Sequence, residues 1–210
     1  MDELINSLSS KFSWEVVIHT YGNSHSTLIG LVSEWWCKRD KNNSVLDGAP
    51  TYYSTKNKEH PRGKGASKSD LILIENKTPV GVVEVEGTHY LNSLEKIGKY
   101  FSSTDFSTIK FGIFITYGYK TVKSGNERKF VSVPIEELLK KSENIIQKYS
   151  HKKLYIINLK KEYVIKGKIG EIDDLETKLR KKQEWYRGNV NKVKIYKIPK
   201  ENEEPKILEF

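Results

Sequence analysis

Apolar positions recur every three or four residues in several segments of the chain, which is the spacing of an amphipathic helix. In residues 27–40, for example, Leu28, Val32 and Trp35 would share one face. Pro134 stands at the first position of another such segment, where proline is favoured. Helices are predicted over residues 2–20, 27–40, 94–101, 134–149 and 171–188.

Shorter apolar runs lie between these helices and predict β-strands. The strands are expected at residues 51–55, 70–74, 80–87, 109–118, 152–159 and 190–198. The runs at 109–118 and 152–159 are apolar enough to be buried on both faces, whereas 190–198 alternates like an edge strand. Residues 41–50 are rich in turn-forming residues, and residues 201–210 read as a frayed tail.

Helices that alternate with buried strands are typical of an α/β fold. We expect a mixed central β-sheet flanked by helices. The core would cover residues 1–165, and a C-terminal helix and strand extension over residues 166–210 would pack on it.

Charge and composition narrow the classes of partner. The chain has 36 Lys and Arg against 27 Asp and Glu, a formal charge of +9, which favours polyanions such as DNA. A lysine-rich genome would give the same excess without any nucleic-acid function. No run approaches the ~18 apolar residues of a membrane span, and the first residues do not resemble a secretory signal. We therefore expect an intracellular protein, cytoplasmic or in the host cytoplasm if viral, that does not act at a membrane.

Three acidic residues stand out because they lie in or beside apolar strands. Glu84 and Glu86 are two positions apart, so their side chains would project from the same face of one strand. If the preceding strand pairs with it across a short turn, Asp70 would lie near both glutamates. Such carboxylates would repel one another unless a divalent cation such as Mg²⁺ or Mn²⁺ lies among them. The alternative is an ordinary amphipathic strand with solvated glutamates.

Asp70, followed after thirteen residues by Glu84-Val85-Glu86, resembles the core motif of the PD-(D/E)xK nucleases. This restriction-endonuclease-like superfamily includes Holliday-junction resolvases, and its order of elements matches residues 26–160. The resemblance implies that Asp70 and Glu84 bind the metal, with the backbone carbonyl of Val85 as a further ligand. Glu86 stands where the family usually has lysine, so it would act as a metal ligand or base.

The same resemblance suggests further site residues. Some members of the family carry the catalytic lysine on the following helix, where Lys96 and Lys99 are the candidates here. Many carry another acid on the first core helix, and Glu34 is the candidate metal ligand, although a solvated glutamate fits that position equally well. His89 could contact a phosphate or simply lie in a loop.

Two basic segments are candidates for nucleic-acid binding. The first lies in a glycine-bearing loop before Asp70, and the second combines cations with an aromatic side chain suited to base stacking. Each could instead be structural, the first as a solvated loop and the second by packing of its tryptophan. Their residues are Arg62, Lys64, Lys68, Arg180, Lys181, Lys182, Trp185 and Arg187.

These observations predict a Mg²⁺- or Mn²⁺-dependent DNA endonuclease, potentially structure-specific for branched DNA. A homodimer is the simplest way to cut two strands. No P-loop is present, so a nucleotide cofactor is not expected. The composition would suit a small archaeal or viral nuclease. The alternatives are a non-catalytic nucleic-acid-binding module on a degenerate nuclease fold, and a protein-interaction subunit of a larger complex.

Overall fold

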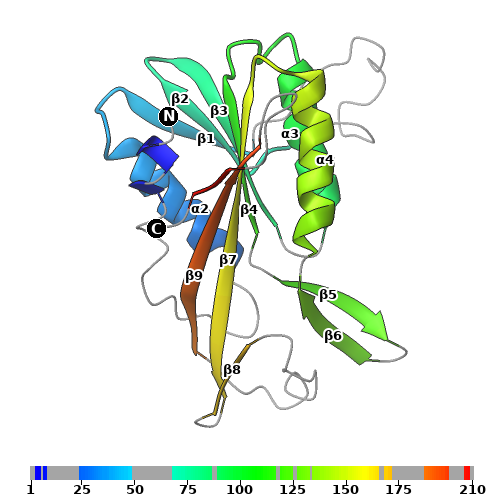
Figure 1. Ribbon diagram of the computed structural model, residues 1–210. Coiled ribbons are helices and arrows are strands. Elements are labelled where there is room, and N and C mark those ends of the chain that lie inside the picture. The colour runs from blue at the N-terminus through cyan, green and yellow to red at the C-terminus, as the bar shows by residue number, and fades with distance from the viewer. Residues whose placement is uncertain are drawn as a thin grey trace.

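The chain forms an α/β fold with a mixed β-sheet and helices on both of its faces, as expected at the level of the α/β class (Figure 1). The computed structural model describes residues 3–5, 7–8, 24–48, 68–86, 89–116, 119–124, 127–132, 134–165, 168–171, 187–198 and 206–208. Among these residues no helix has the length and apolar character needed to cross a membrane.

The main sheet has eight strands, and its centre is formed by three parallel strands. β3 pairs with β4 and β4 with β7 in parallel, whereas β2 pairs with β3 and β1 with β2 in antiparallel fashion. β9 pairs antiparallel with the other side of β7, β10 extends the sheet beyond β9, and β8 pairs with β7. The strand bounds are β1 Asn43–Asp47, β2 Leu71–Glu75, β3 Thr78–Glu86, β4 Phe111–Thr116, β7 Lys153–Ile165, β8 Lys168–Glu171, β9 Arg187–Lys197 and β10 Lys206–Leu208.

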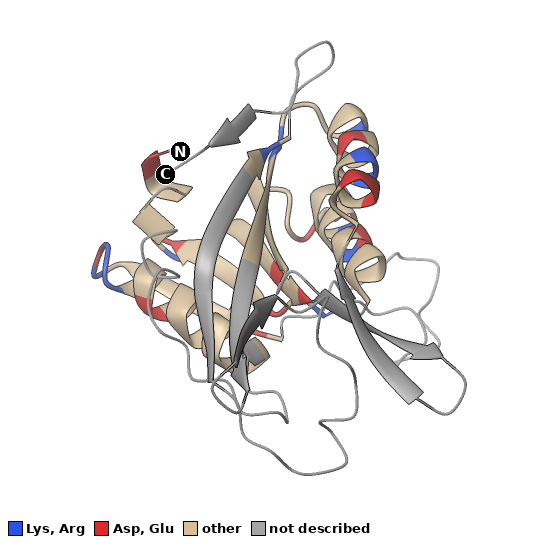
Figure 2. Ribbon diagram, turned by 60° about the horizontal axis from the view of Figure 1, so that its bottom comes forward, with Lys and Arg blue, Asp and Glu red and all other residues tan. Residues whose placement is uncertain are grey.

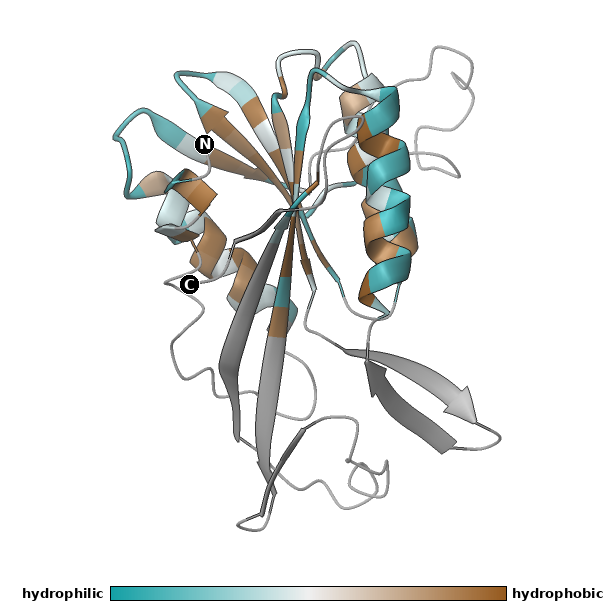
Figure 3. Ribbon diagram, in the orientation of Figure 1, coloured by the Kyte–Doolittle hydropathy of each residue, from teal (hydrophilic) through white to brown (hydrophobic). Residues whose placement is uncertain are grey.

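Helices cover the two faces of this sheet and bury a separate hydrophobic cluster on each (Figure 1). α2 (Ser24–Cys37) packs on one face, where it contributes Val32 and Trp35. α3 (Tyr90–Ser102) and α4 (Ile135–Lys148) pack on the other face. Charged residues are frequent on α3 and α4 and sparse on the central strands, which are mostly hydrophobic (Figures 2 and 3).

Alternation along the central strands assigns each side chain to one face. On β3, Val83 and Val85 belong to the cluster under α2, whereas Val82 belongs to the cluster under α3 and α4. Glu84 and Glu86 share the phase of Val82, so they are on the α3 side of the sheet. The alternative of a solvated glutamate is wrong for Glu84, which has no exposed surface, whereas Glu86 is half-buried.

Gly112 on β4 allows α3 to approach the sheet closely. A Cβ atom at this position would lie 2.6 Å from Cγ2 of Ile97 and 3.1 Å from Cζ of Phe101, both on α3. Any side chain here would push the helix outward. Gly112 therefore allows α3 to pack closely on β4.

The structure differs from the sequence prediction in several elements. The expected turn at residues 41–50 contains β1, because the short apolar stretch pairs along its whole length with β2. β5 (Tyr119–Ser124) and β6 (Glu127–Ser132) form an unpredicted two-stranded sheet. α3 begins at Tyr90, four residues before the predicted start, with His89 as its N-cap.

The C-terminal segment also differs from its prediction. β9 is not an edge strand over its last residues, because β10 pairs with it within the expected frayed tail. The predicted helix at 171–188 begins within β8 and ends within β9, and residues 172–186 lie outside the described residues. The predicted strand at 51–55 and most of the predicted helix at 2–20 also lie outside them.

Candidate functional site

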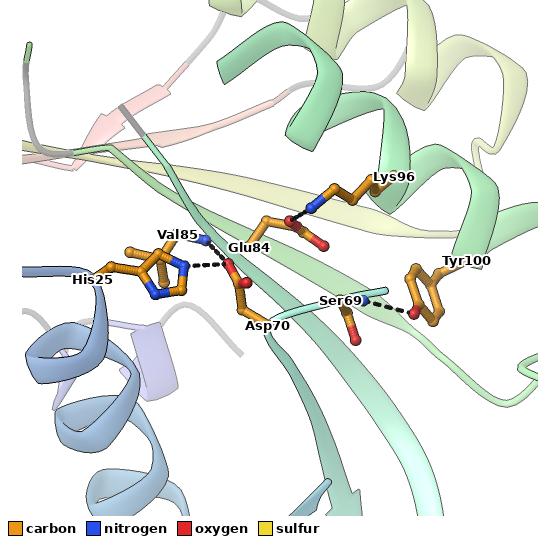
Figure 4. A network of polar contacts seen from close by, with 7 residues as sticks. All are labelled: His25, Ser69, Asp70, Glu84, Val85, Lys96 and Tyr100. Atoms are coloured by element: carbon orange, nitrogen blue, oxygen red, sulfur yellow. Dashed lines mark hydrogen bonds and ion pairs between the residues drawn. The ribbon is translucent and has the colours of Figure 1, made fainter. Parts of the chain in front are cut away.

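Asp70 lies at the start of β2, beside the carboxyl end of β3. The antiparallel pairing of Leu71 with Val83 brings Asp70, the residue before β2, next to the last residues of β3. The Val85 backbone N–H donates a hydrogen bond of 2.7 Å to Oδ2 of Asp70, which fixes this carboxylate at the strand end (Figure 4). The predicted proximity of Asp70 to the acids of β3 is therefore present in the structure.

Glu84 is fully buried at the end of β3, on the face of the sheet that α3 covers and not on the face that α2 covers. Its Oε2 accepts a 2.9 Å hydrogen bond from the Lys96 ammonium on α3, whereas its buried Oε1 has no hydrogen-bond partner (Figure 4). A buried carboxylate oxygen without a partner is costly and is typical of a site that binds an ion or water.

Burial and charge together perturb the protonation of this pair. The pKa of Glu84 is raised to about 8, mainly by burial and next by the negative charge of Asp70, against the opposing effect of Lys96. Burial alone would lower the pKa of Lys96, but its hydrogen bond to Glu84 and the neighbouring acids raise it. Glu84 thus carries a proton near neutral pH unless a bound metal ion takes the place of that proton.

His25 is a site residue that the sequence analysis did not identify. Its Nε2 lies 3.3 Å from Oδ2 of Asp70, and its side chain is 41% exposed (Figure 4). The hydrogen bond to Asp70 raises the pKa of His25, burial opposes this, and the charges of Asp70, Glu86 and Glu84 add to the rise. The sequence signal is weak, because His25 precedes the first clearly periodic apolar residue of α2 and could equally have been a loop residue.

Tyr100 anchors the segment that carries Asp70. The backbone N–H of Ser69 donates a 2.8 Å hydrogen bond to the Tyr100 hydroxyl, and both residues are buried (Figure 4). Tyr100 is four residues beyond Lys96, so the two side chains leave the same face of α3. One helix face therefore contacts both the strand that carries Glu84 and the segment that precedes β2.

The other predicted site residues occupy different places. Glu86 ends β3 on the same face as Glu84 and is half-buried. Lys99, His89 and Lys68 are exposed, and His89 is the N-cap of α3. Val85 is buried, and its amide rather than its carbonyl makes the contact with Asp70.

Glu34 is not brought to this site. It is exposed and pairs with Lys38, the residue that follows the end of α2. Its neighbour Trp36 donates to the carbonyl oxygen of Ile74, at the far end of β2 from Asp70. Glu34 is nine residues beyond His25, which on a helix is about 14 Å.

The predicted nucleic-acid contacts fall largely outside the described residues. This applies to Arg62, Lys64, Arg180, Lys181, Lys182 and Trp185. Arg187 is the first residue of β9.

The donor atoms at the strand end suit a hard cation but do not form a complete cage. Asp70, Glu84 and the Val85 carbonyl offer oxygen ligands, and the unpartnered Oε1 of Glu84 fits such a role. Among the described residues no group of three or more His, Cys, Asp or Glu side chains is placed to hold a metal ion. Mg²⁺ commonly binds through one or two carboxylates and keeps several waters, so the residues present fit it.

Comparisons with known proteins add no assignment. No protein-family model, no curated protein and no solved structure matches this chain.

Proposed function

We propose that this protein is a metal-dependent nuclease of the PD-(D/E)xK type that hydrolyses phosphodiester bonds in DNA. The observation that carries the proposal is the buried Glu84 carboxyl, whose Oε1 has no partner, beside Asp70 at the end of a central parallel strand. A structural role alone would be better filled by an apolar residue, because burying a partly unsatisfied carboxyl destabilises the fold.

Asp70, Glu84 and the Val85 carbonyl would hold Mg²⁺ or Mn²⁺. The cation, when bound, polarises the phosphodiester and makes a water molecule more acidic. Glu86, on the same face two residues after Glu84, would accept a proton from the attacking water or bind a second ion. The restriction-endonuclease-like core, implied by the resemblance, is supported by the mixed sheet and by these strand positions.

Lys96 would take the place of the lysine that the motif lacks at Glu86. Its ammonium lies 2.9 Å from Glu84 and its side chain is 29% exposed, so it can contact both the carboxylate and a bound phosphate. A cation in this position would orient the attacking water and stabilise the charge that develops on the phosphate. The position of Lys96 therefore favours a catalytic site over a non-catalytic binding module.

DNA is the favoured substrate because of the charge around the site. Ser69 and Tyr100 are joined by a hydrogen bond, and the residues that precede them, Lys68 and Lys99, are both exposed. Together with His25 and a net charge of +9, they would attract a phosphate backbone. A homodimer would place two such sites on the two strands of a duplex.

The experiment is cleavage of supercoiled and four-way branched DNA with Mg²⁺, Mn²⁺ or EDTA. It compares the wild type with Asp70→Asn, Glu84→Gln and the control Glu95→Gln, whose exposed carboxyl pairs with Lys141. We expect metal-dependent nicking by the wild type and the control, and loss of at least ~100-fold in the two site variants. Equal nicking by all four proteins would contradict the proposal. DNA binding without cleavage by any of them would favour the non-catalytic binding module.

A further inference from the structure

A row of polar residues crosses the three parallel strands, at the carboxyl ends of β3 and β4 and in the middle of the longer β7. Glu86 on β3 is in register with Thr116 on β4, and Thr116 is in register with Asn158 on β7. Phe114 and Ile156, which lie two positions before Thr116 and Asn158 and so face the same way, belong to the hydrophobic cluster under α3 and α4. The three polar residues are therefore on that same face. Glu86 and Thr116 are the last residues of their strands, at the end where ligands bind in open α/β sheets.

Asn158 is the member of this row that most needs an explanation. Its side chain is nine-tenths buried, with 9% exposure, and its Oδ1 has no hydrogen-bond partner. An apolar residue of similar size would fill this position without leaving a buried acceptor unsatisfied. The neighbouring inward positions of β7, Leu154 and Ile156, are apolar. Asn158 thus follows two apolar positions of the same face and is level with the last residue of β4.

The unsatisfied groups are concentrated at this end of the sheet. The described residues contain four buried side-chain atoms without a partner, on Asn43, Ser69, Glu84 and Asn158. Ser69 and Glu84 belong to the carboxylate site. Asn43 is the exception, because it pairs with Glu75 at the opposite end of β2 from Asp70. Buried polar groups without a partner are typical of positions with a catalytic role or with a bound water or ion.

The row has a length that suits a nucleic-acid strand. Glu86 and Asn158 are separated by two strand spacings, roughly 9.5 Å between their backbones. Successive nucleotides of a duplex strand rise by about 3.4 Å, so this distance corresponds to about three steps. A strand with its scissile phosphate near Glu84 and Glu86 would reach Asn158 within a few nucleotides.

We propose that Asn158 forms a subsite for a nucleotide that flanks the scissile phosphate, and that its carboxamide hydrogen bonds to this nucleotide. The inference rests on the proposed nuclease function and extends it. The buried Oδ1 is an acceptor, so it requires a hydrogen-bond donor from the ligand. Internal DNA phosphates and deoxyriboses supply no donor, whereas base edges and the ribose 2′-hydroxyl do. The shared chemistry is a donor group on a nucleobase or on a ribose.

The experiment measures the affinity of single-stranded oligonucleotides by fluorescence anisotropy, with Ca²⁺ in place of Mg²⁺ so that binding is observed without cleavage. The probes are a DNA 12-mer, an RNA 12-mer of the same sequence, and a DNA 12-mer with a run of abasic residues. The proteins are the wild type, Asn158→Leu and the control Asn43→Leu. Thermal unfolding of each variant verifies that it is folded.

We expect Asn158→Leu to weaken the binding of one or more probes by about tenfold. Asn43→Leu should leave binding unchanged. A loss on both DNA and RNA but not on the abasic probe identifies a base as the donor. A loss on RNA alone identifies the 2′-hydroxyl. Unchanged affinity for all probes in Asn158→Leu would overturn the inference, as would an equal loss on all three, which requires no donor.

A further measurement separates this inference from its alternatives. If Asn158→Leu abolished Mn²⁺ binding in a calorimetric titration without nucleic acid, Asn158 would be a metal ligand and the subsite would be wrong. If the wild type bound none of the probes, the proposed nuclease function itself would fail. Binding by the wild type with no effect of Asn158→Leu would remove only the subsite.

Discussion

Lys96 on α3 contacts Glu84 on β3 across the interface between helix and sheet, with 2.9 Å between Nζ and Oε2. The Glu84 side chain has no exposed surface, whereas that of Lys96 is 29% exposed. The lysine therefore connects a buried carboxyl group to solvent. This pair can respond to a ligand, because Lys96 can turn toward a phosphate while Glu84 takes another cation.

Replacing Lys96 should separate catalysis from folding. In Lys96→Met, Glu84 loses a cationic partner and is held more firmly in its neutral form, so the fold is preserved. We expect DNA cleavage to fall by about 100-fold or more, the usual range for a lost proton-transferring or charge-stabilising group. The initial rate of plasmid nicking measures this.

The control is Lys141→Met. Lys141 forms an ion pair with Glu95 of α3 in a more exposed setting, so its loss should leave cleavage within about twofold of the wild type. Equal losses in the two variants would mean that Lys96 has no specific role.

The raised pKa of Glu84 predicts how stability changes with pH. Because the folded-state pKa of about 8 exceeds the ordinary value of 4.5, the folded protein holds the proton more tightly. This contribution is fully present below pH 4.5 and is lost as the pH rises to 8. Its size is on the order of a few kcal/mol. Urea unfolding at pH 5, 7 and 9 should show the loss in the wild type.

Glu84→Gln is the matched variant for this measurement, because glutamine is neutral at every pH. The stability difference between wild type and Glu84→Gln should move in favour of the variant as the pH rises. A difference that is constant with pH would show that Glu84 does not titrate in this range.

His25 should compete with a cation for Asp70. Its pKa is raised by the hydrogen bond to Asp70, so at mildly acidic pH the protonated imidazole repels a metal ion at that carboxylate. In His25→Gln we expect Mn²⁺ to bind several-fold more tightly at pH 6 and with little change at pH 8. Dissociation constants at the two pH values measure this. Weaker binding by the variant at pH 6 would indicate that His25 supports the metal instead.

Gly112→Ala should destabilise the fold, because the added methyl group meets Ile97 at 2.6 Å. The expected cost is about 1–3 kcal/mol in urea unfolding. Gly30→Ala on α2 is the control, because nothing lies within 4 Å of its Cβ position and alanine favours helices by roughly 1 kcal/mol. A neutral effect of Gly112→Ala would contradict the close approach of α3.

The central strands could be predicted because their sequence pattern is local. Residues 70–74 and 109–118 are dominated by apolar and β-branched residues. The structure places β2 one residue later than the first range and β4 within the second. The shared face of Glu84 and Glu86 follows from alternation alone. The elements that were missed depend on distant partners. β1 is short and resembles a turn until it pairs with β2, and β10 requires β9.

The candidate site was only partly accessible from the sequence for a similar reason. The contact of Lys96 with Glu84 depends on how α3 crosses the sheet. The sequence offered Lys96 and Lys99 as candidates for the catalytic lysine but could not choose between them. The acid expected from α2 was Glu34, but the end of α2 near Asp70 carries His25. Helix periodicity defines the buried face and leaves open which end of the helix approaches the site.

The most direct measurement of the central claim is a calorimetric titration of the metal-free protein with Mn²⁺ at pH 7.5. The account predicts that the wild type and Glu95→Gln bind the ion and release protons as they do so, because Glu84 must lose its proton. It predicts that Asp70→Asn and Glu84→Gln lose this binding and this proton release. Equal Mn²⁺ binding by all four proteins would contradict the assignment of the metal site to Asp70 and Glu84.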